Sequence, residues 1–346
     1  MKYFNNLIVF GLLPLFVGVS FIEGVIGYTT IYIEEVWVDD DYCEGCFNEG
    51  HKWGYDAFDT IQDGIDALNE NGRVMVHEGT YPENVNIHKK IILKVEDERN
   101  LTCIDGAGGL HCIRINTNAD NCVIDGFTCM NASFGIVVQS NANLIQNTLL
   151  CHNYFGMYLH DSNSSTITNN KMIDNYYGGL NLNASHSNDV YENVIAHNTV
   201  EGIKLFFSYY NSIHHNIISE NVCGFELGGY KNKIWRNSIL RNSEIGIHSW
   251  ATCANSLYEN NFIDNGEDAS FSHVFLIGYS KPVDLLWINN NQWYSNYWNE
   301  ARVLPKILAG QIRIYYDVEN ITSYTFPWYE VDWFPAREPF DIRIGV

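Results

Sequence analysis

The stretch that decides the fold is Asn188-Asp-Val-Tyr-Glu-Asn-Val-Ile-Ala-His-Asn-Thr-Val-Glu-Gly202, because the chain repeats its pattern before and after it. One polar column recurs at steps of 23, 23, 23, 21 and 23 residues, and a second follows five residues later. The columns are Asn147, Asn170, Asn193, Asn216, Asn237, Asn260 and His152, Asn175, Asn198, Asn221, Asn242, Asn265. A period of this length predicts an all-β fold, a single-stranded right-handed parallel β-helix with three short strands per coil.

The composition of the repeats supports strands over helices. Helical solenoids need roughly 33 residues or more per repeat, and β-branched, Asn and Gly residues disfavour helix. Asparagine tolerates left-handed turns, and its amide can hydrogen-bond the amide one coil away, so we interpret both columns as structural. We expect two aliphatic columns to point inward: Leu144, Ile167, Val190, Ile213, Ile234, Leu257 and Leu149, Met172, Ile195, Ile218, Ile239, Phe262.

The N-terminal residues 1–27 have the features of a secretory signal peptide. Lys2 precedes the apolar run Leu7 to Val19, and cleavage is predicted near Gly27. An uncleaved anchor is the alternative. No later run reaches the ~20 apolar residues that span a bilayer. The sequence therefore predicts an exported protein, extracellular, periplasmic or on the cell surface.

The remaining chain divides into three predicted parts. Residues 28–73 contain an N-terminal strand, a loop and a capping helix, whose apolar face carries Phe58, Ile61, Ile65 and Leu68. Residues 74–270 form the β-helix. Residues 271–346, which are rich in aromatics and proline, form a C-terminal capping region.

Charge and residue counts restrict the partners. A formal charge of −21 argues against nucleic acid and anionic membranes, because both repel such a surface. Nine cysteines in an exported chain predict some disulfides. Five glycosylation sequons suit a glycoprotein surface: Asn100, Asn131, Asn163, Asn183 and Asn320. The oligomeric state is left open.

Three motifs carry a family resemblance. Tyr55 to Leu68, Val74 to Val85 and Ile104 to Gly106 resemble the start of pectin-lyase-like β-helix proteins. Together with the Asn-rich coils they look most like the NosD-type, or carbohydrate-binding and sugar-hydrolase (CASH), repeat proteins. Asn291 to Asn299 resembles the C-terminal end of many such prokaryotic surface proteins. The resemblance covers about residues 55–300 and implies the fold.

The resemblance does not imply one function, since the superfamily holds lyases, hydrolases, esterases, epimerases, adhesins and a copper-enzyme accessory protein. Gly79 to Glu83 matches the opening motif of pectin methylesterases, but their later catalytic motifs have no counterpart. The aspartate motifs of polygalacturonases and the Asp-Pro-His pattern of alginate-modifying relatives are also missing. We therefore expect a non-catalytic role in polysaccharide or glycan binding or in an envelope. The alternatives are a polysaccharide lyase or glycoside hydrolase for acidic polysaccharides, and a NosD-like periplasmic copper accessory protein.

Two outward columns follow the closing glycines. Lys204, Glu226 and His248 project from successive coils, where they could supply acid and base groups or bind a uronate. The structural alternative is an exposed Lys204–Glu226 ion pair. The expected glycan contacts around them are Tyr158, His160, Asn181, Asn183, Phe206 and Trp250.

A further outward column starts at Ile145 and Thr168 and continues as an aromatic stripe of Tyr191, His214, Trp235 and Tyr258. It fits a glycan or protein contact, or stacking between coils that stabilises the sheet.

Metal ligands are sparse. Twelve histidines are scattered, and the adjacent His214 and His215 are predicted to point to opposite faces of a strand. Cys43, Cys46 and His51 could form half of a zinc site, but a local Cys43–Cys46 disulfide is favoured. The acid-rich loop before them could take calcium, although it lacks a dedicated calcium-loop pattern. No cofactor is otherwise indicated.

Overall fold

The computed structural model describes residues 33–96, 102–276, 291–317 and 322–342. The chain divides into two units, Met1–Ile33 and Glu34–Val346, and the second contains the fold. The predicted signal peptide and the sequons at Asn100 and Asn320 lie outside the described residues. In the described part, no helix is long and apolar enough to cross a bilayer.

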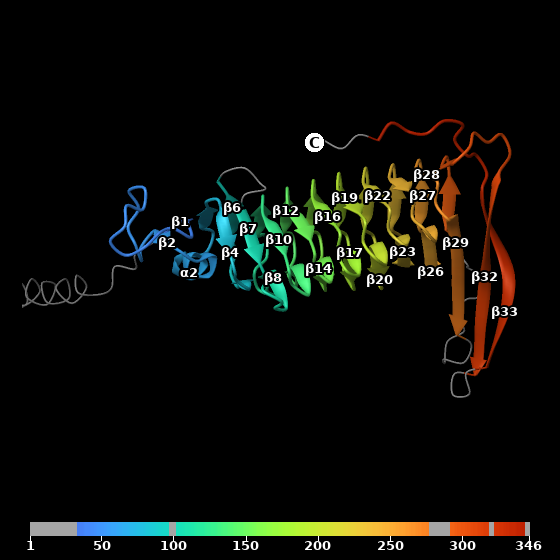
Figure 1. The fold of residues 1–346 in the computed structure, drawn as a ribbon. Coiled ribbons are helices and arrows are strands. Elements are labelled where there is room, and N and C mark those ends of the chain that lie inside the picture. Colours follow the sequence, from blue (N-terminus) through green and yellow to red (C-terminus); the bar gives the residue numbers. More distant parts are fainter. Residues whose placement is uncertain (1–32, 97–101, 277–290, 318–321, 343–346) are drawn as a thin grey trace, which may run out of the picture. The chain divides into compact units, whose positions relative to one another are not determined.

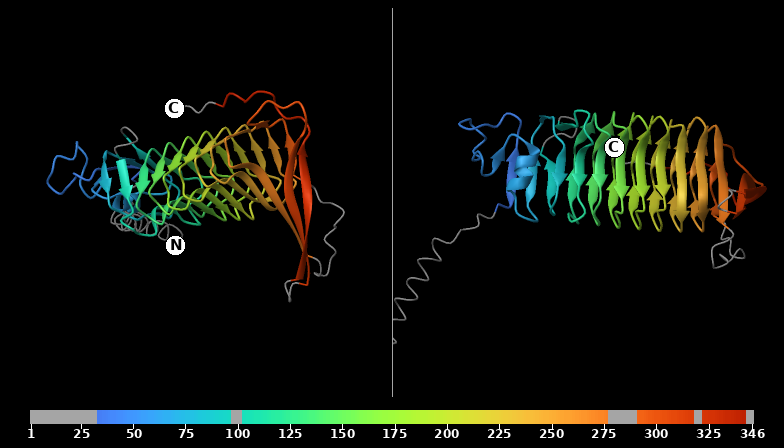
Figure 2. Two further views of the ribbon diagram at one scale, coloured as in Figure 1. Left: turned by 45° about the vertical axis from the view of Figure 1, so that its right-hand side comes forward. Right: turned by 90° about the horizontal axis from the view of Figure 1, so that it is seen from below.

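The second unit is a right-handed parallel β-helix, as predicted, in which the coils stack side by side (Figures 1 and 2). Each regular coil contributes one strand to each of three faces. The long face consists of β5 (Val85–Ile87), β8 (His111–Ile115), β11 (Phe134–Val138), β14 (Phe155–His160), β17 (Gly178–Asn183), β20 (Glu201–Phe206), β23 (Cys223–Tyr230), β26 (Ile245–Cys253), β29 (Glu267–Leu276) and β32 (Lys306–Asp317).

The other two faces have shorter strands. The second face consists of β1 (Glu35–Val38), β3 (Arg73–Val76), β6 (Ile92–Val95), β9 (Val123–Asp125), β12 (Leu144–Gln146), β15 (Thr166–Thr168), β18 (Asp189–Tyr191), β21 (Ser212–His214), β24 (Lys233–Trp235), β27 (Ser256–Tyr258), β30 (Gln292–Tyr294) and β33 (Thr322–Asp332). The third face consists of β4 (Gly79–Tyr81), β7 (Thr102–Asp105), β10 (Thr128–Met130), β13 (Leu149–Cys151), β16 (Lys171–Ile173), β19 (Val194–Ala196), β22 (Ile217–Ser219), β25 (Ser238–Leu240), β28 (Asn261–Ile263) and β31 (Tyr297–Trp298).

The core is a set of aliphatic columns that run along the stack. Ile167, Val190 and Ile213 pair coil by coil and are completely buried. Burying each such side chain stabilises the fold by about 1.5–3 kcal/mol relative to exposing it.

Asparagine side chains at the turns form ladders that connect every coil to the next. The side-chain oxygen of Asn193 accepts the backbone N–H of Asn170 at 2.9 Å, and its amide donates to the carbonyl of Ile167 at 2.9 Å. Asn193 in turn donates its backbone N–H to Asn216 at 3.0 Å. From Asn170 and Asn175 onward, both predicted columns are such ladders. A third, which the sequence analysis missed, runs through Asn188, Asn211, Asn232, Asn255 and Asn291.

In the first regular coil the predicted register is wrong by one residue. Ile145 and Leu150 are buried and pair with Ile167 and Met172, whereas Leu144 and Leu149 are only half-buried. Likewise, Thr148 and Asn153 occupy the ladder positions predicted for Asn147 and His152. The cause is a step of 22 residues to the next coil, from Thr148 to Asn170.

The N-terminal end is covered by a short helix, α2 (Ile61–Ala67), whose N-cap Thr60 accepts the backbone N–H of Asp63 at 3.2 Å. Ile61 and Ile65 are buried beneath it. The helix is shorter than predicted, because Phe58 belongs to the two-residue strand β2 (Ala57–Phe58). Parallel pairing also begins before residue 74, since β1 pairs with β3.

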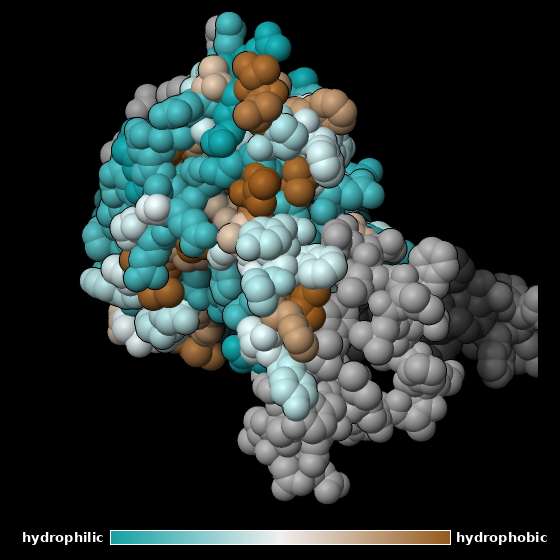
Figure 3. All heavy atoms as spheres, turned by 90° about the vertical axis from the view of Figure 1, so that its right-hand side faces the viewer, coloured by the Kyte–Doolittle hydropathy of each residue, from teal (hydrophilic) through white to brown (hydrophobic). Residues whose placement is uncertain are grey.

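The C-terminal end continues past residue 270. Strands β30 and β31 stack on β27 and β28 as one further coil, and the antiparallel hairpin of β32 and β33 follows. The carboxylate of Asp332 accepts the backbone N–H of Asn296 at 3.0 Å and the indole N–H of Trp298 at 3.0 Å. Figure 3 looks onto this end, where hydrophobic side chains lie among polar ones; exposed here are Tyr324, Phe326, Trp328, Tyr329, Trp333 and Phe334.

Candidate functional site

The centre of the long face carries a polar row formed by Lys204 on β20, Glu226 on β23 and His248 on β26. The three residues pair directly with one another across the adjacent strands, as the repeat predicts. Lys204 and Glu226 are about one-quarter exposed. The His248 side chain is half-buried and makes no hydrogen bond within the described residues. The row therefore presents an ion pair and a free imidazole on one surface.

Glu201 is the residue of this site that the sequence analysis missed. The Lys204 ammonium lies 2.9 Å from Oε1 of Glu201 and 2.6 Å from Oε2 of Glu226, so it bridges two carboxylates. Glu201 is 5% exposed, and its Oε2 is buried without a hydrogen-bond partner in the described part of the chain. Residues three apart on a regular strand point to opposite sides. Glu201 nevertheless reaches Lys204, because the in-and-out alternation of side chains along β20 is interrupted at Gly202.

Electrostatics keep this lysine charged. Burial alone lowers the pKa of Lys204, but hydrogen bonds and charges from Glu226 and Glu201 outweigh it and raise the pKa above its usual value. Burial raises the pKa of Glu201, against the lowering effect of Lys204. A general base must be unprotonated at the working pH, so this arrangement disfavours Lys204 as the base of a lyase.

An aromatic pair, Phe206 and Trp250, lies beside the polar row on the same face. Phe206 lies two positions after Lys204, and Trp250 lies two positions after His248. Both rings therefore project to the same side of the sheet as the polar row. The rings are nearly parallel, 11° apart, with centroids separated by 6.1 Å. Trp250 is 37% exposed, and the intervening strand has Gly228 opposite it.

The other four expected glycan contacts largely bind one another. Asn183 donates its side-chain amide to the Tyr158 hydroxyl at 2.8 Å, and the Tyr158 and His160 rings stack at 6.0 Å. Asn181 is buried, with an exposed fraction of 8%. Their polar groups are thus less accessible than the outward pattern predicts.

The aromatic stripe forms one continuous stack on the second face. Ring centroids lie 5.2 Å apart from Tyr191 to His214, 4.5 Å from His214 to Trp235 and 5.9 Å from Trp235 to Tyr258. Tyr294 continues the stack at 4.8 Å. The rings inside the stack have both faces covered by neighbouring rings, so only their edges are accessible to a ligand. The stripe therefore fits stabilisation between coils best.

The structure corrects the prediction for His214 and His215. The two side chains do not point to opposite faces: their Nδ1 atoms are 2.9 Å apart. The strand ends at His214, and His215 has a φ of 55°, in the left-handed region. That turn brings the second imidazole back beside the first.

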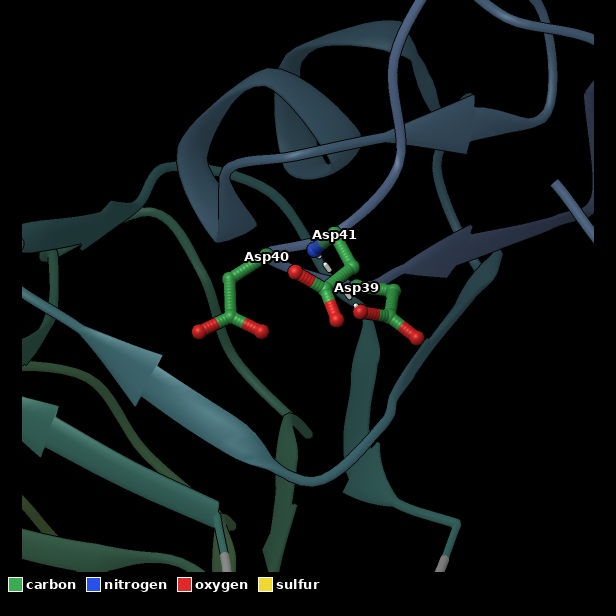
Figure 4. A group of neighbouring side chains, drawn as sticks. All are labelled: Asp39, Asp40 and Asp41. Carbon is green, nitrogen blue, oxygen red and sulfur yellow. Dashed lines mark hydrogen bonds between the residues drawn. The ribbon is translucent and has the colours of Figure 1, made fainter. Parts of the chain in front are cut away.

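The predicted N-terminal ligand cluster has a different arrangement. Cys43 and Cys46 form the expected disulfide, which leaves no thiolate of this pair to bind a metal, and His51 pairs with Asp56 at 3.4 Å. In the described residues, Asp39, Asp40 and Asp41 are the group of three His, Cys, Asp or Glu side chains whose ligand atoms come together (Figure 4). Two of them already accept backbone N–H groups, Asp39 from Asp41 and Asp40 from Thr80.

Comparisons with known proteins agree with the fold. The family model described as periplasmic copper-binding protein (NosD) matches residues 67–302. No curated protein matches the chain.

Several solved structures are similar to this chain. Pectate lyase Pel9A superposes with a TM-score of 0.55 at 16% identity, over 79% of this chain and 81% of its own. The periplasmic alginate epimerase AlgG gives 0.45 at 13% identity, over 70% and 83%. An alginate lyase from Paenibacillus sp. gives 0.45 at 11% identity, over 68% and 92%. At such identities the pectate lyase likeness shows the fold alone.

Proposed function

This chain belongs to the NosD family, and from that premise we propose that it is an exported β-helix protein that binds a polysaccharide without cleaving it. The binding surface is the centre of the long face, formed by the polar row and the aromatic pair. The family description as periplasmic supports export.

The observation that carries the proposal is the position of the Phe206 and Trp250 rings beside Glu226 and His248 on one surface. Sugar rings offer C–H faces that suit aromatic side chains and hydroxyls that suit polar ones. The imidazole of His248 is half-buried and the Glu226 carboxylate is about one-quarter exposed, so both can bind sugar hydroxyls.

The pairing of Lys204 favours binding over catalysis. Lys204 is held as an ammonium between Glu201 and Glu226, so neither carboxylate is independent of it. This ammonium also has both partners within the protein, which favours a neutral glycan over an acidic one as the ligand.

The test is electrophoresis of the protein in native gels cast with neutral and acidic polysaccharides, with and without calcium. We expect retardation by a neutral polysaccharide, no cleared zone, and a mobility restored by Trp250→Ala. The matched control is Trp235→Ala, which removes an indole from the second face. A cleared zone would identify an enzyme instead, and unchanged mobility in every gel would refute the binding proposal. If calcium changes the mobility, the Asp40→Asn variant shows whether the acidic group Asp39, Asp40 and Asp41 is responsible.

The copper accessory alternative has less support from the described residues. Copper sites use imidazole, thiolate or thioether ligands, whereas the three-residue cluster consists of Asp39, Asp40 and Asp41. The imidazoles of His214 and His215 on the second face have the appropriate chemistry, but their Nδ1 atoms hydrogen-bond to each other.

A further inference from the structure

Two buried cysteines meet at one junction between coils, away from the polar row. Cys112 is on β8, near the start of the long face, and Cys129 is the middle residue of β10, on the third face of the next coil. Both side chains are completely buried. In the structure both are free thiols, and the Cys112 thiol donates to the carbonyl of Met130, 3.2 Å away.

The repeat shows where the side chain at position 112 points. In the coils from β11 to β26 the equivalent position is glycine: Gly135, Gly156, Gly179, Gly202, Gly224 and Gly246. A β-carbon on any of the first four would contact the inward third-face side chain of the next coil; these side chains are Leu150, Met172, Ile195 and Ile218. Cys129 precedes Leu150 in this third-face column, so Cys112 points at Cys129.

The spacing between the two columns suits a disulfide, which needs β-carbons about 3.5–4.5 Å apart. At the equivalent pair of Gly156 and Met172, a β-carbon on the glycine would lie 3.3 Å from the β-carbon of Met172. A real side chain at that position opens the distance by a few tenths of an ångström, into the range of a disulfide. The thiols of Cys112 and Cys129 also contact each other through a side-chain hydrogen bond.

Two other cysteines lie nearby but do not fit this contact. Cys103 and Cys151 are on the third-face strands that flank β10. They adjoin the inward residues Ile104 and Leu150, so the alternation of a strand turns their side chains away from the interior. Cys112 therefore has Cys129 as its partner.

The cysteine pair lies where an asparagine ladder ends. The ladder of the turn before the long face runs down to Asn153, whose side-chain oxygen accepts the backbone N–H of Ala132 at 3.1 Å. Ala132 occupies the next ladder position and has no side-chain oxygen to offer to the preceding coil. Cys112 follows this turn in the preceding coil, and Cys129 comes just before the turn in the coil of Ala132. A covalent bond between them would span the junction that the ladder leaves open.

We propose that Cys112 and Cys129 form a disulfide that joins β8 to β10 of the next coil. The inference rests on the proposed export, because disulfides persist in oxidising compartments. The two thiols lose two protons and two electrons, the Sγ–Sγ bond forms, and a disulfide oxidant is reduced to two thiols. Burial and the contact with Cys112 raise the pKa of the Cys129 thiol, which disfavours the reactive thiolate in the folded protein. The bond therefore forms during folding, before the coils close over the pair.

The experiment maps the bond in the full chain. The protein is denatured, reduced and refolded in a buffer of reduced and oxidised glutathione, free thiols are alkylated in denaturant, and unreduced peptides are analysed by mass spectrometry. We expect peptides joined through Cys112 and Cys129, beside the Cys43–Cys46 bridge. Alkylation of both Cys112 and Cys129, or a bond from either to another cysteine, would overturn the proposal. The mapping uses neither a polysaccharide nor a cell, so its failure is distinct from a failure of glycan binding or of export.

Urea unfolding with and without dithiothreitol gives a second readout. Reduction should lower the folded-to-unfolded ratio of the wild type roughly 100-fold more than that of Cys112→Ala, because only the wild type has the loop from Cys112 to Cys129 closed. Both proteins contain the Cys43–Cys46 bridge, so its reduction cancels in the comparison. The matched control, Cys103→Ala, should respond to dithiothreitol as the wild type does. An equal response of the wild type and Cys112→Ala would contradict the bond, and circular dichroism verifies that each variant is folded.

Discussion

Asp332 accepts the backbone N–H of Asn296 at 3.0 Å, in the same way that Asn296 accepts the backbone N–H of Asn260 at 3.1 Å. A carboxylate from the terminal hairpin thus takes the place of the next asparagine and ends the ladder. The last backbone N–H of this ladder, that of Asn296, is therefore bonded within the same molecule by the terminal hairpin.

Asp332→Ala should destabilise the protein by about 2–5 kcal/mol, because the buried N–H groups of Asn296 and Trp298 lose their acceptor. Asp332→Asn should remain within about 1 kcal/mol of the wild type, since its amide oxygen can accept the same bonds. Urea unfolding measures both. Equal stability of the alanine and asparagine variants would show that the contact is not a cap.

An interior ladder position should be equally sensitive. Asn193→Ala removes the acceptor of the Asn170 N–H and the donor to the Ile167 carbonyl, both buried, so we expect a loss of about 2–4 kcal/mol in unfolding free energy. The control is Asn118→Ala, at an exposed turn, which should change stability by less than about 0.5 kcal/mol. Similar losses for both variants would contradict a specific role of the ladder.

Lys204→Met should destabilise the fold by about 2–4 kcal/mol at neutral pH, because Glu201 and Glu226 lose their shared counter-ion. Acidification toward pH 5 should recover part of the loss, since burial raises the pKa of Glu201 and protonation removes the uncompensated charge. Adding Glu201→Gln should recover stability at pH 7. Thermal unfolding across pH measures these effects, and a pH-independent loss would argue against an electrostatic cause.

The free cysteines should be unreactive in the native protein at pH 8. Burial raises the pKa of Cys103 and Cys122 to about 11 and of Cys223 to about 12, so little reactive thiolate is present. A raised thiol pKa stabilises the fold below the ordinary value of 9.0, and this contribution is lost as pH rises toward about 12. Iodoacetamide labelling with peptide mapping checks the first point and unfolding at pH 8 to 11 the second. Rapid labelling of Cys122 without denaturant would contradict the expected protection.

The repeat predicted the strands, the two ladders and the polar row because a fixed period places equivalent residues in line. The register of the first coil was predicted one residue too early because Asn147 and Thr148 both fit the turn pattern. Aligning the asparagines assumed a step of 23 residues, whereas the step from Thr148 to Asn170 is 22 residues. Glu201 was missed because its position precedes a glycine at which the alternation breaks. A signal for His215 did exist: it directly precedes the ladder residue Asn216, and turn residues at that position leave the strand conformation.

The ladders also bear on how such a protein can change in length. Because each coil satisfies its neighbour with the same asparagine bonds, a whole coil of about 23 residues can be inserted or removed without creating a new kind of junction. Each such event shifts the terminal hairpin by one strand spacing, about 4.8 Å, relative to the helix α2. The distance between the two caps is therefore adjustable in uniform steps during evolution or by design, while the arrangement of residues on any three consecutive coils is preserved.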